Sequence, residues 1–293
     1  TRVDEAIAMA SRAPLDLRVN TLKASQDKVL ASMKHLGTRA TPWSPWGLRI
    51  DLGADARNPG IHSEEAFIKG GVEVQDEGSQ LAALLTGAKP GQQVIDMCAG
   101  AGGKTLALAA MMQGKGRLIA TDHDKRQLAP IHERLSRAGI HNADVRTPRG
   151  PDDTLSDIKA SADLVVIDAP CTGTGTWRRN PDAKWRMRPG ALEVRIKDQV
   201  EVLDRAAGLV KPGGRIAYIT CSVLPQENNE QVKAFTARHP DYAVVPPEQV
   251  MSVLWDKADD FAAATIRSDE GLLMTPRRTG TDGFFVSVMT RRN

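Results

Sequence analysis

The stretch QVIDMCAGAGGKT, residues 93–105, decides the fold. Its apolar beginning, 93–97, predicts a buried strand, and the residues after the glycine-rich turn predict a helix at 104–112. A strand that opens through glycines into a helix is typical of parallel α/β sheets, whose ligands collect at the carboxyl ends of the strands. We therefore expect the turn to be a ligand-binding loop.

The loop matches no complete phosphate or dinucleotide motif. A P-loop needs glycine where Cys98 stands, and a GxGxxG fingerprint that begins at Gly100 needs glycine where Thr105 stands. Asp122 ends the next predicted strand, 20 residues after Gly102, where an acid commonly accepts hydrogen bonds from ribose hydroxyls. A ribose without a gripped pyrophosphate favours the adenosine of S-adenosylmethionine. The alternative is a tight turn with Asp122 as a helix cap.

Predicted strands and helices alternate from about Val74 onward. Strands are expected at 93–97, 117–121, 144–147, 163–167, 215–220 and 284–289. Helices are expected at 78–85, 104–112, 125–138, 192–210 and 226–238. We expect KPGG at 211–214 to stop one helix and Pro225 to begin the last. The alternation predicts an α/β fold with a doubly wound, mostly parallel sheet.

The first part of the chain has a different pattern. Residues 1–75 hold an apolar segment at 15–22, an amphipathic helix at 28–36 and a strand-like run at 47–52. They predict a small α/β domain of mixed topology, and the larger sheet then occupies residues 76–293. We expect the small domain to act as a clamp or adaptor for the substrate.

The cysteines limit the kind of protein. Cys98, Cys171 and Cys221 are widely spaced and form no CxxC pair, so neither a disulfide framework nor a zinc site is expected. Histidines are few and scattered, so no metal is expected; a reducing, cytoplasmic compartment suits the free thiols. No apolar run is long enough for a membrane helix, and no membrane partner is expected. Because Thr1 is not an initiator methionine, we expect a processed or truncated chain.

Two cysteines follow predicted strands directly. Asp168 and Cys171 stand in LVVIDAPCTGTG, and Cys221 stands in RIAYITCSVLPQEN. A lone cysteine in such a place is more often a small buried residue, but two with an acid at neighbouring strand ends favour thiol chemistry. The helix predicted after Cys221 should favour the thiolate and lower its pKa.

A basic segment follows the first of these thiols. Its cationic residues are Arg178, Arg179, Lys184, Arg186 and Arg188, with Trp177 and Trp185 among them. Basic groups interleaved with aromatic rings suit phosphate contact and base stacking. The alternative is a solvated loop that the tryptophans anchor to the core. The net charge of +3 does not by itself indicate nucleic acid.

These motifs together resemble a known family. The segments DMCAGAGGKT, DAPCTGTG and TCSVLPQEN are similar to those of the RNA cytosine-5 methyltransferases of the Sun/Fmu (RsmB) family, as are RRNPDAKWR, PLDLRVNTLK and GTDGFF. The resemblance covers most of residues 76–293 and is closest to the bacterial branch that acts on 16S ribosomal RNA. It implies the S-adenosylmethionine-dependent methyltransferase fold. Members of that branch carry a further N-terminal helical domain.

The resemblance also implies residue roles. The Cys221 thiolate would add to C6 of cytosine so that C5 attacks the methyl group of S-adenosylmethionine, and Cys171 would assist the departure of Cys221. Asp168 would hold the base near N3, beside the cofactor. The cofactor site would comprise Cys98, Ala99, Gly100, Ala101, Gly102, Gly103, Lys104, Asp122 and Asp168. A monomer would bind structured RNA with an unstacked target base, held by the small domain and by Arg178, Arg179, Lys184 and Arg186.

The chain departs from the family in three places, the least of which is Thr172, where serine is usual. The usual loop CAAPGGKT has Gly100 and Ala101 here, and the loss of proline leaves the loop less preorganised. Arg146, Pro148 and Arg149 occupy the region where an acid is expected near the adenine. These departures support an alternative, a catalytically silent RNA-binding or ribosome-assembly factor.

Retention of both thiols argues against the silent factor, because binding alone needs neither. A third hypothesis is an exocyclic-amine methyltransferase, but its motif ends in an aromatic residue where this chain has Cys171.

Overall fold

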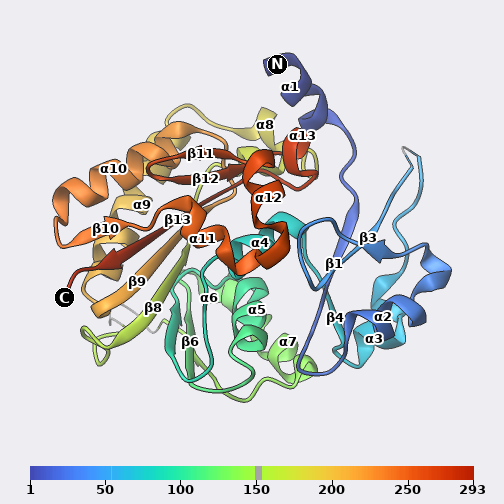
Figure 1. Ribbon diagram of the computed structural model, residues 1–293, viewed down its shortest axis with the longest axis horizontal. Coiled ribbons are helices and arrows are strands. Elements are labelled where there is room, and N and C mark those ends of the chain that lie inside the picture. Colours follow the sequence, from blue (N-terminus) through green and yellow to red (C-terminus); the bar gives the residue numbers. More distant parts are fainter. Residues whose placement is uncertain (54, 149–153) are drawn as a thin grey trace.

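The computed structural model describes residues 1–53, 55–148 and 154–293, which form a large sheet and a small one (Figure 1). Five parallel strands make the centre of the large sheet, in the spatial order β9-β8-β5-β6-β7. They are β5 (Gln93–Asp96), β6 (Arg117–Thr121), β7 (Ala143–Arg146), β8 (Ala162–Asp168) and β9 (Val210–Thr220). The predicted mostly parallel α/β sheet is confirmed.

The large sheet continues beyond β9 with antiparallel strands. β13 (Phe284–Arg291) pairs with β9, and the short strands β10 (Tyr242–Val244) and β12 (Gly271–Met274) both pair with β13. β11 (Ile266–Ser268) pairs with β12. The sequence predicted β13 but none of these short strands, because three or four residues carry too little periodicity to show a strand.

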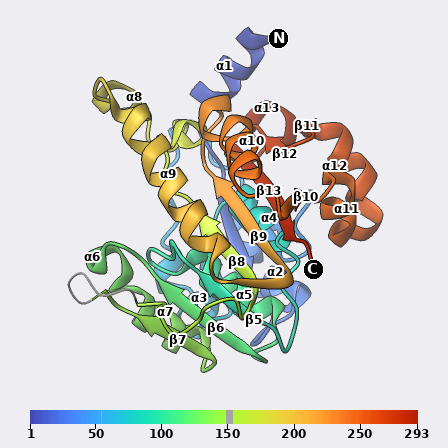
Figure 2. The same cartoon turned by 90° about the vertical axis from the view of Figure 1, so that its left-hand side faces the viewer.

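Helices cover both faces of this sheet. Figure 2 shows α9 (Ala191–Ala207) on one side of the strands, with α11 (Pro247–Met251) and α12 (Ala258–Ala264) on the other. The remaining helices of this part are α4 (Glu77–Leu84), α5 (Gly103–Met111), α6 (Lys125–Leu128), α7 (Ile131–Ala138), α8 (Ala183–Arg186), α10 (Asn229–Arg238) and α13 (Pro276–Thr279). Because strand side chains alternate between faces, Leu164 and Val166 join one apolar core, and Val165 and Ile167 join the other.

The small sheet has the order β2-β3-β1-β4 and its own apolar core. Its strands are β1 (Leu15–Val19), β2 (Arg39–Ala40), β3 (Gly47–Ile50) and β4 (Val72–Val74), and its helices are α2 (Gln26–Ser32) and α3 (Glu65–Ile68). Every pairing is antiparallel, so the expected mixed topology is wrong. The two sheets divide between β4 and α4. The domain boundary at residue 75 stays a prediction. The N-terminal helix α1 (Arg2–Ala10) contacts α13.

Two predicted boundaries are wrong for reasons of backbone chemistry. The helix predicted at 192–210 ends at Ala207, and KPGG lies inside β9, where the register against β8 shifts. Proline and glycine mark a strand irregularity as readily as a helix end. The helix predicted at 125–138 is divided into α6 and α7, with Pro130 directly before α7. In the described ranges, no helix is long and apolar enough to cross a membrane.

Candidate active site

The carboxyl ends of β5, β8 and β9 bring the predicted site residues to one edge of the sheet. Cys98 follows β5, Asp168 ends β8, and Cys221 follows β9 directly. The Cys171 and Cys221 Sγ atoms lie 3.4 Å apart. The Gly175 N–H donates to the Cys221 carbonyl at 2.9 Å and ties the two thiol-bearing loops together. The two thiols are therefore close enough to contact the same part of a substrate.

The environment of Cys221 corrects one expectation. Its hydrogen bond with Cys171, its burial and the charge of Asp168 raise the pKa of the Cys221 thiol well above its ordinary value. The predicted lowering is wrong because Pro225 begins only a 3₁₀ turn, and α10 starts later, at Asn229. The neighbouring acid and thiol outweigh any helix end. Lys104 acts in the opposite direction and favours the thiolate.

A pocket of about 300 Å³ lies at the glycine loop. Its walls are Ser79, Cys98, Ala99, Gly100, Ala101, Gly103, Lys104, Asp122, His123, Gln127, Asp168 and Pro170. The Gly100 N–H donates to Asp122 Oδ2 at 2.8 Å, and Lys104 Nζ donates to Asp168 Oδ2 at 2.7 Å. The structure thus places both predicted cofactor-binding acids, with most of the loop, around one cavity.

Gly102, the loop residue outside that list, shapes the turn. Its φ is +87°, and a Cβ there would lie 2.5 Å from Ile131 Cγ1, on α7. Any side chain would displace α7 or distort the loop, so glycine is required here for packing as well as for conformation.

Three carboxylates lie near this pocket. Burial, together with the negative charges of Asp168 and Asp122, raises the pKa of Asp96 to about 7, against the hydrogen bond that Thr105 Oγ1 donates at 2.7 Å. Because the negative charges of these carboxylates repel one another, a cationic ligand in the pocket would be stabilised. Burial also raises the pKa of Cys98, so that thiol stays protonated and forms a neutral wall.

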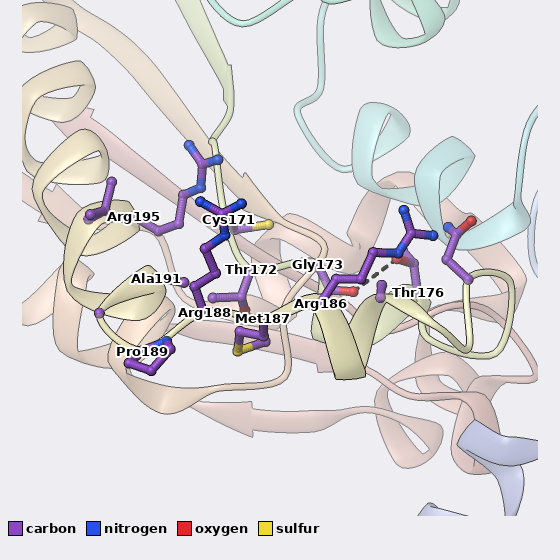
Figure 3. A pocket seen from close by; sticks show the side chains of 14 residues that line it. Cys171, Thr172, Gly173, Thr176, Arg186, Met187, Arg188, Pro189, Ala191 and Arg195 are labelled. Carbon is purple, nitrogen blue, oxygen red and sulfur yellow. Dashed lines mark hydrogen bonds between the residues drawn. The ribbon is translucent and has the colours of Figure 1, made fainter.

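A second pocket of about 770 Å³ opens on the other side of Cys171 (Figure 3). Three arginines, Arg186, Arg188 and Arg195, line it together with Met187. Figure 3 shows Arg188 and Arg195 on the side of Cys171, and Arg186 on the side of Thr176. Its cationic walls suit an anionic, extended ligand such as a nucleic-acid backbone.

The four arginine and lysine residues predicted to bind RNA divide into two pairs. Arg178 and Arg179 both form ion pairs with Asp76 and Asp282, and the Arg178 side chain is only 6% exposed. The Arg178 guanidinium is too enclosed to contact an RNA backbone, so the expectation for Arg178 is revised to a structural role. Arg179 shares these ion pairs but is 28% exposed, and its contact with RNA stays a prediction. Asp76 also caps α4 through Gly78 N, so the network holds the loop against that helix.

Lys184 and Arg186, in contrast, belong to α8, none of whose residues is buried. Trp185 between them is 81% exposed, and Lys184 Nζ lies 5.2 Å from the centroid of its ring. Trp185 is therefore not anchored in the core, whereas Trp177 is half-buried, so the alternative interpretation fails for Trp185 alone. Arg149, from the region expected to approach adenine, lies outside the described residues, and Arg146 pairs with Asp144 and Asp157.

Sequence reasoning missed two contributors to the site, Glu227 and Ser79. Glu227 is fully buried and accepts hydrogen bonds from Thr172, next to Cys171. Its only signal was an acid inside the motif TCSVLPQEN. Ser79 accepts from Lys104 Nζ at 3.3 Å, and nothing in the sequence near the glycine loop pointed to it. Within the described parts of the chain, no group of three or more His, Cys, Asp or Glu residues could hold a metal ion.

The fold and the pocket define a class. A parallel sheet extended by antiparallel β13, with a glycine loop after β5 and an acid after β6, is the sheet of S-adenosylmethionine-dependent methyltransferases. The sequence model of the 16S rRNA methyltransferase RsmB/F family matches residues 83–290. The chain belongs to this family, and the predicted resemblance is confirmed.

Individual relatives support the same family membership. The chain is 34% identical over 284 residues to ribosomal RNA small subunit methyltransferase B of Sodalis glossinidius, covering 96% of this chain and 60% of that protein. The chain thus spans less than two thirds of that relative. The crystal structure of PH0851 superposes with a TM-score of 0.83 at 30% identity, over 98% of this chain and 61% of that one. NSun6 from Pyrococcus horikoshii, solved with SFG, has a TM-score of 0.80 at 20% identity, over 99% and 94%.

Proposed function

We propose that this protein methylates C5 of cytosine in RNA, with 16S ribosomal RNA as substrate and S-adenosylmethionine as methyl donor. The observation that carries the proposal is the pair of thiols 3.4 Å apart. Asp168 and Pro170 line the smaller pocket, Cys171 lines the larger, and Cys221 contacts Cys171, so the chain segment 168–171 contributes to both pockets beside the thiols. Family membership supports the reaction type, and the free thiols suit the cytoplasm.

The glycine-loop pocket fits S-adenosylmethionine. The cofactor would supply a methyl group on a cationic sulfur, and the carboxylates Asp122 and Asp168, which line the pocket, would provide the negative surroundings that such a charge needs. Besides the hydrogen bond that it accepts from the Gly100 N–H, the Asp122 carboxylate has lone pairs that could accept hydrogen bonds from ribose hydroxyls. Lys104 fixes the orientation of Asp168 at the junction between the pockets.

The two thiols would have different roles in the reaction of the cytosine base. Cys221 would form a bond to C6, which moves an electron pair toward C5 and makes that carbon nucleophilic. Asp168 would hold the ring edge near N3. After C5 has gained the methyl group, the C5 proton must leave and the C6–S bond must break. Cys171, in contact with Cys221, is placed to assist this step as the base. Because the Cys221 pKa is raised, its thiolate has to form in the complex, where Lys104 favours it.

Asp122→Ala tests the cofactor site. We expect the Kd for S-adenosylmethionine to rise by roughly 10–100-fold, since hydrogen bonds to a charged acceptor contribute about 1.5–3 kcal/mol. Isothermal titration calorimetry measures the change. The neighbouring Asp124→Ala, which removes a helix cap but no wall of the cofactor pocket, is the control. Equal binding by wild type and the Asp122 variant, or no binding at all, would instead favour the silent RNA-binding factor.

Lys184→Ala with Arg186→Ala tests the RNA surface. If both side chains contact phosphates, the slope of log K against log salt should become shallower by roughly 1.4, at about 0.7 per contact on single strands. Fluorescence anisotropy with a ribosomal RNA fragment measures this slope. Arg178→Ala is the control, because its guanidinium is buried in ion pairs and its loss should lower stability. An unchanged slope in the double variant would contradict the assignment.

A further inference from the structure

We propose that Glu227 is a positioning residue, whose carboxylate holds the loop carrying Cys171 against the loop carrying Cys221. The inference rests on the covalent mechanism proposed above and adds a residue that the mechanism did not use. Three features of Glu227 support the inference: the contacts of its carboxylate, its attachment to the Cys221 loop and its burial.

The carboxylate holds one neighbour of Cys171 directly and the other through Gln199. Glu227 Oε1 accepts from the Thr172 N–H at 2.8 Å, and Oε2 accepts from Thr172 Oγ1 at 2.5 Å. Gln199 Nε2 donates to Glu227 Oε1 at 3.1 Å and also to the Pro170 carbonyl at 2.9 Å. Pro170 and Thr172 are the residues on either side of Cys171. The backbone that carries this thiol is therefore held from both directions.

Glu227 itself belongs to the Cys221 side. It ends the 3₁₀ turn Pro225–Glu227, which follows the loop of Cys221, and its N–H donates to the Leu224 carbonyl at 3.1 Å. The Glu227 carbonyl accepts from Tyr218 OH at 2.7 Å, and Tyr218 is a fully buried residue of β9. The carboxylate is thus a link between the end of β8 and the end of β9.

The burial of Glu227 makes this link rigid. A carboxylate without solvent is stable only when hydrogen bonds replace its hydration, and bonds to an ionised acceptor are shorter and stronger than neutral ones. Glu227 is 0% exposed, so the donors on Thr172 and Gln199 take that role. Any movement of the Cys171 loop would break these bonds together.

The same contacts argue against a direct chemical role. Glu227 lines neither the larger nor the smaller pocket, and both of its oxygens already accept hydrogen bonds from the loop. It therefore acts through Cys171. A misplacement of about 1 Å in a catalytic group can lower a rate by roughly 10²-fold, which is enough for such a link to matter.

Comparison of Glu227→Ala with Glu227→Gln tests the proposal. Alanine removes every acceptor, so we expect turnover to fall by roughly 10²-fold while covalent protein–RNA complexes accumulate, as in Cys171→Ala. Glutamine should restore turnover close to wild type, because its carbonyl can accept from the Thr172 N–H and its amide can donate to Thr172 Oγ1. Denaturing electrophoresis measures the adduct, and transfer of a labelled methyl group measures turnover.

A double-variant experiment separates positioning from general destabilisation. If Glu227 acts through Cys171, adding Glu227→Ala to Cys171→Ala should cause no further loss of turnover. Glu73→Ala is the matched control: Glu73 is also a buried acid, but its ion-pair partners, Arg134 and Arg137, belong to α7 and not to either thiol loop. We expect that variant to lose stability without accumulating adduct. Should Glu227→Ala fail to fold, Thr172→Ala removes the Oε2 contact alone and should show a smaller accumulation of adduct.

Two results would overturn the proposal. The first is a Glu227→Gln variant as inactive as Glu227→Ala, which would give the carboxylate a chemical role. The second is normal release of RNA by a folded Glu227→Ala variant. In that case wild-type methylation and adduct trapping by Cys171→Ala would leave the proposed function intact. If no variant forms an adduct and wild type transfers no methyl group, the proposed function itself fails.

Discussion

Cys221→Ala is expected to abolish methyl transfer and to leave no covalent protein–RNA complex. The thiol is the group that would add to C6, and without it C5 is too weak a nucleophile to accept the methyl group. We expect turnover to fall by more than roughly 10⁴-fold, the scale on which loss of a covalent nucleophile acts. Transfer of labelled methyl groups to RNA measures the loss, and denaturing electrophoresis measures the adduct.

The chain supplies a matched control for this variant in its third cysteine. Cys98 lines the cofactor pocket, and its raised pKa keeps the thiol protonated, so Cys98→Ala should retain adduct formation. Binding of S-adenosylmethionine to the Cys221 variant should also persist, because Cys221 is not a wall of that pocket. A Cys221→Ala enzyme with wild-type turnover would disprove a covalent role for this thiol.

The parts of the site that the sequence predicted are local in the chain. The glycine loop, Asp168-Ala169-Pro170-Cys171 and Thr220-Cys221 each follow an apolar run that reads as a buried strand, and the structure places all three at one sheet edge. Their neighbourhood follows from the parallel order β9-β8-β5, because the carboxyl ends of such strands face the same way. The distance of 3.4 Å between thiols depends on the loops and required the structure.

The errors come from partners distant in sequence. Arg178 and Arg179 read as a basic surface because their counterions, Asp76 and Asp282, stand about a hundred positions away in opposite directions. Likewise the helix predicted after Cys221 suggested a lowered pKa, but Cys171 and Asp168 across the β8–β9 junction determine its direction. Local patterns show which residues can ionise, and only the fold shows which charges they meet.

Glu227 is a further residue whose role depends on a partner distant in sequence. An acid within a thiol motif invites a catalytic interpretation, yet its oxygens accept hydrogen bonds from the backbone and side chain of a loop 55 residues earlier. Hydrogen bonds between the two thiol loops therefore fix the position of one loop relative to the other. Under the proposed mechanism, Cys221 would attack the base, and Cys171 would be held in place for a later step.

Cys171→Ala is expected to form the bond to RNA but to release it poorly. Cys221 remains available to attack C6, whereas the group in contact with it that would take the C5 proton is missing. Stalled complexes should therefore accumulate in the presence of S-adenosylmethionine and survive denaturing electrophoresis. Multiple-turnover methylation should be lost, while a single round of methyl transfer should persist.

The double variant Cys171→Ala with Cys221→Ala is the control, and it should show no adduct because the attacking thiol is absent. An adduct seen only when Cys221 is replaced would reverse the two roles. Full activity of both single variants would contradict the covalent mechanism altogether. The prediction thus depends on an asymmetry between two neighbouring thiols: Cys171 lines the larger pocket beside Thr172, whereas Cys221 receives the opposing influences of Asp168 and Lys104. A stalled Cys171 variant would show that this difference in surroundings divides attack from release.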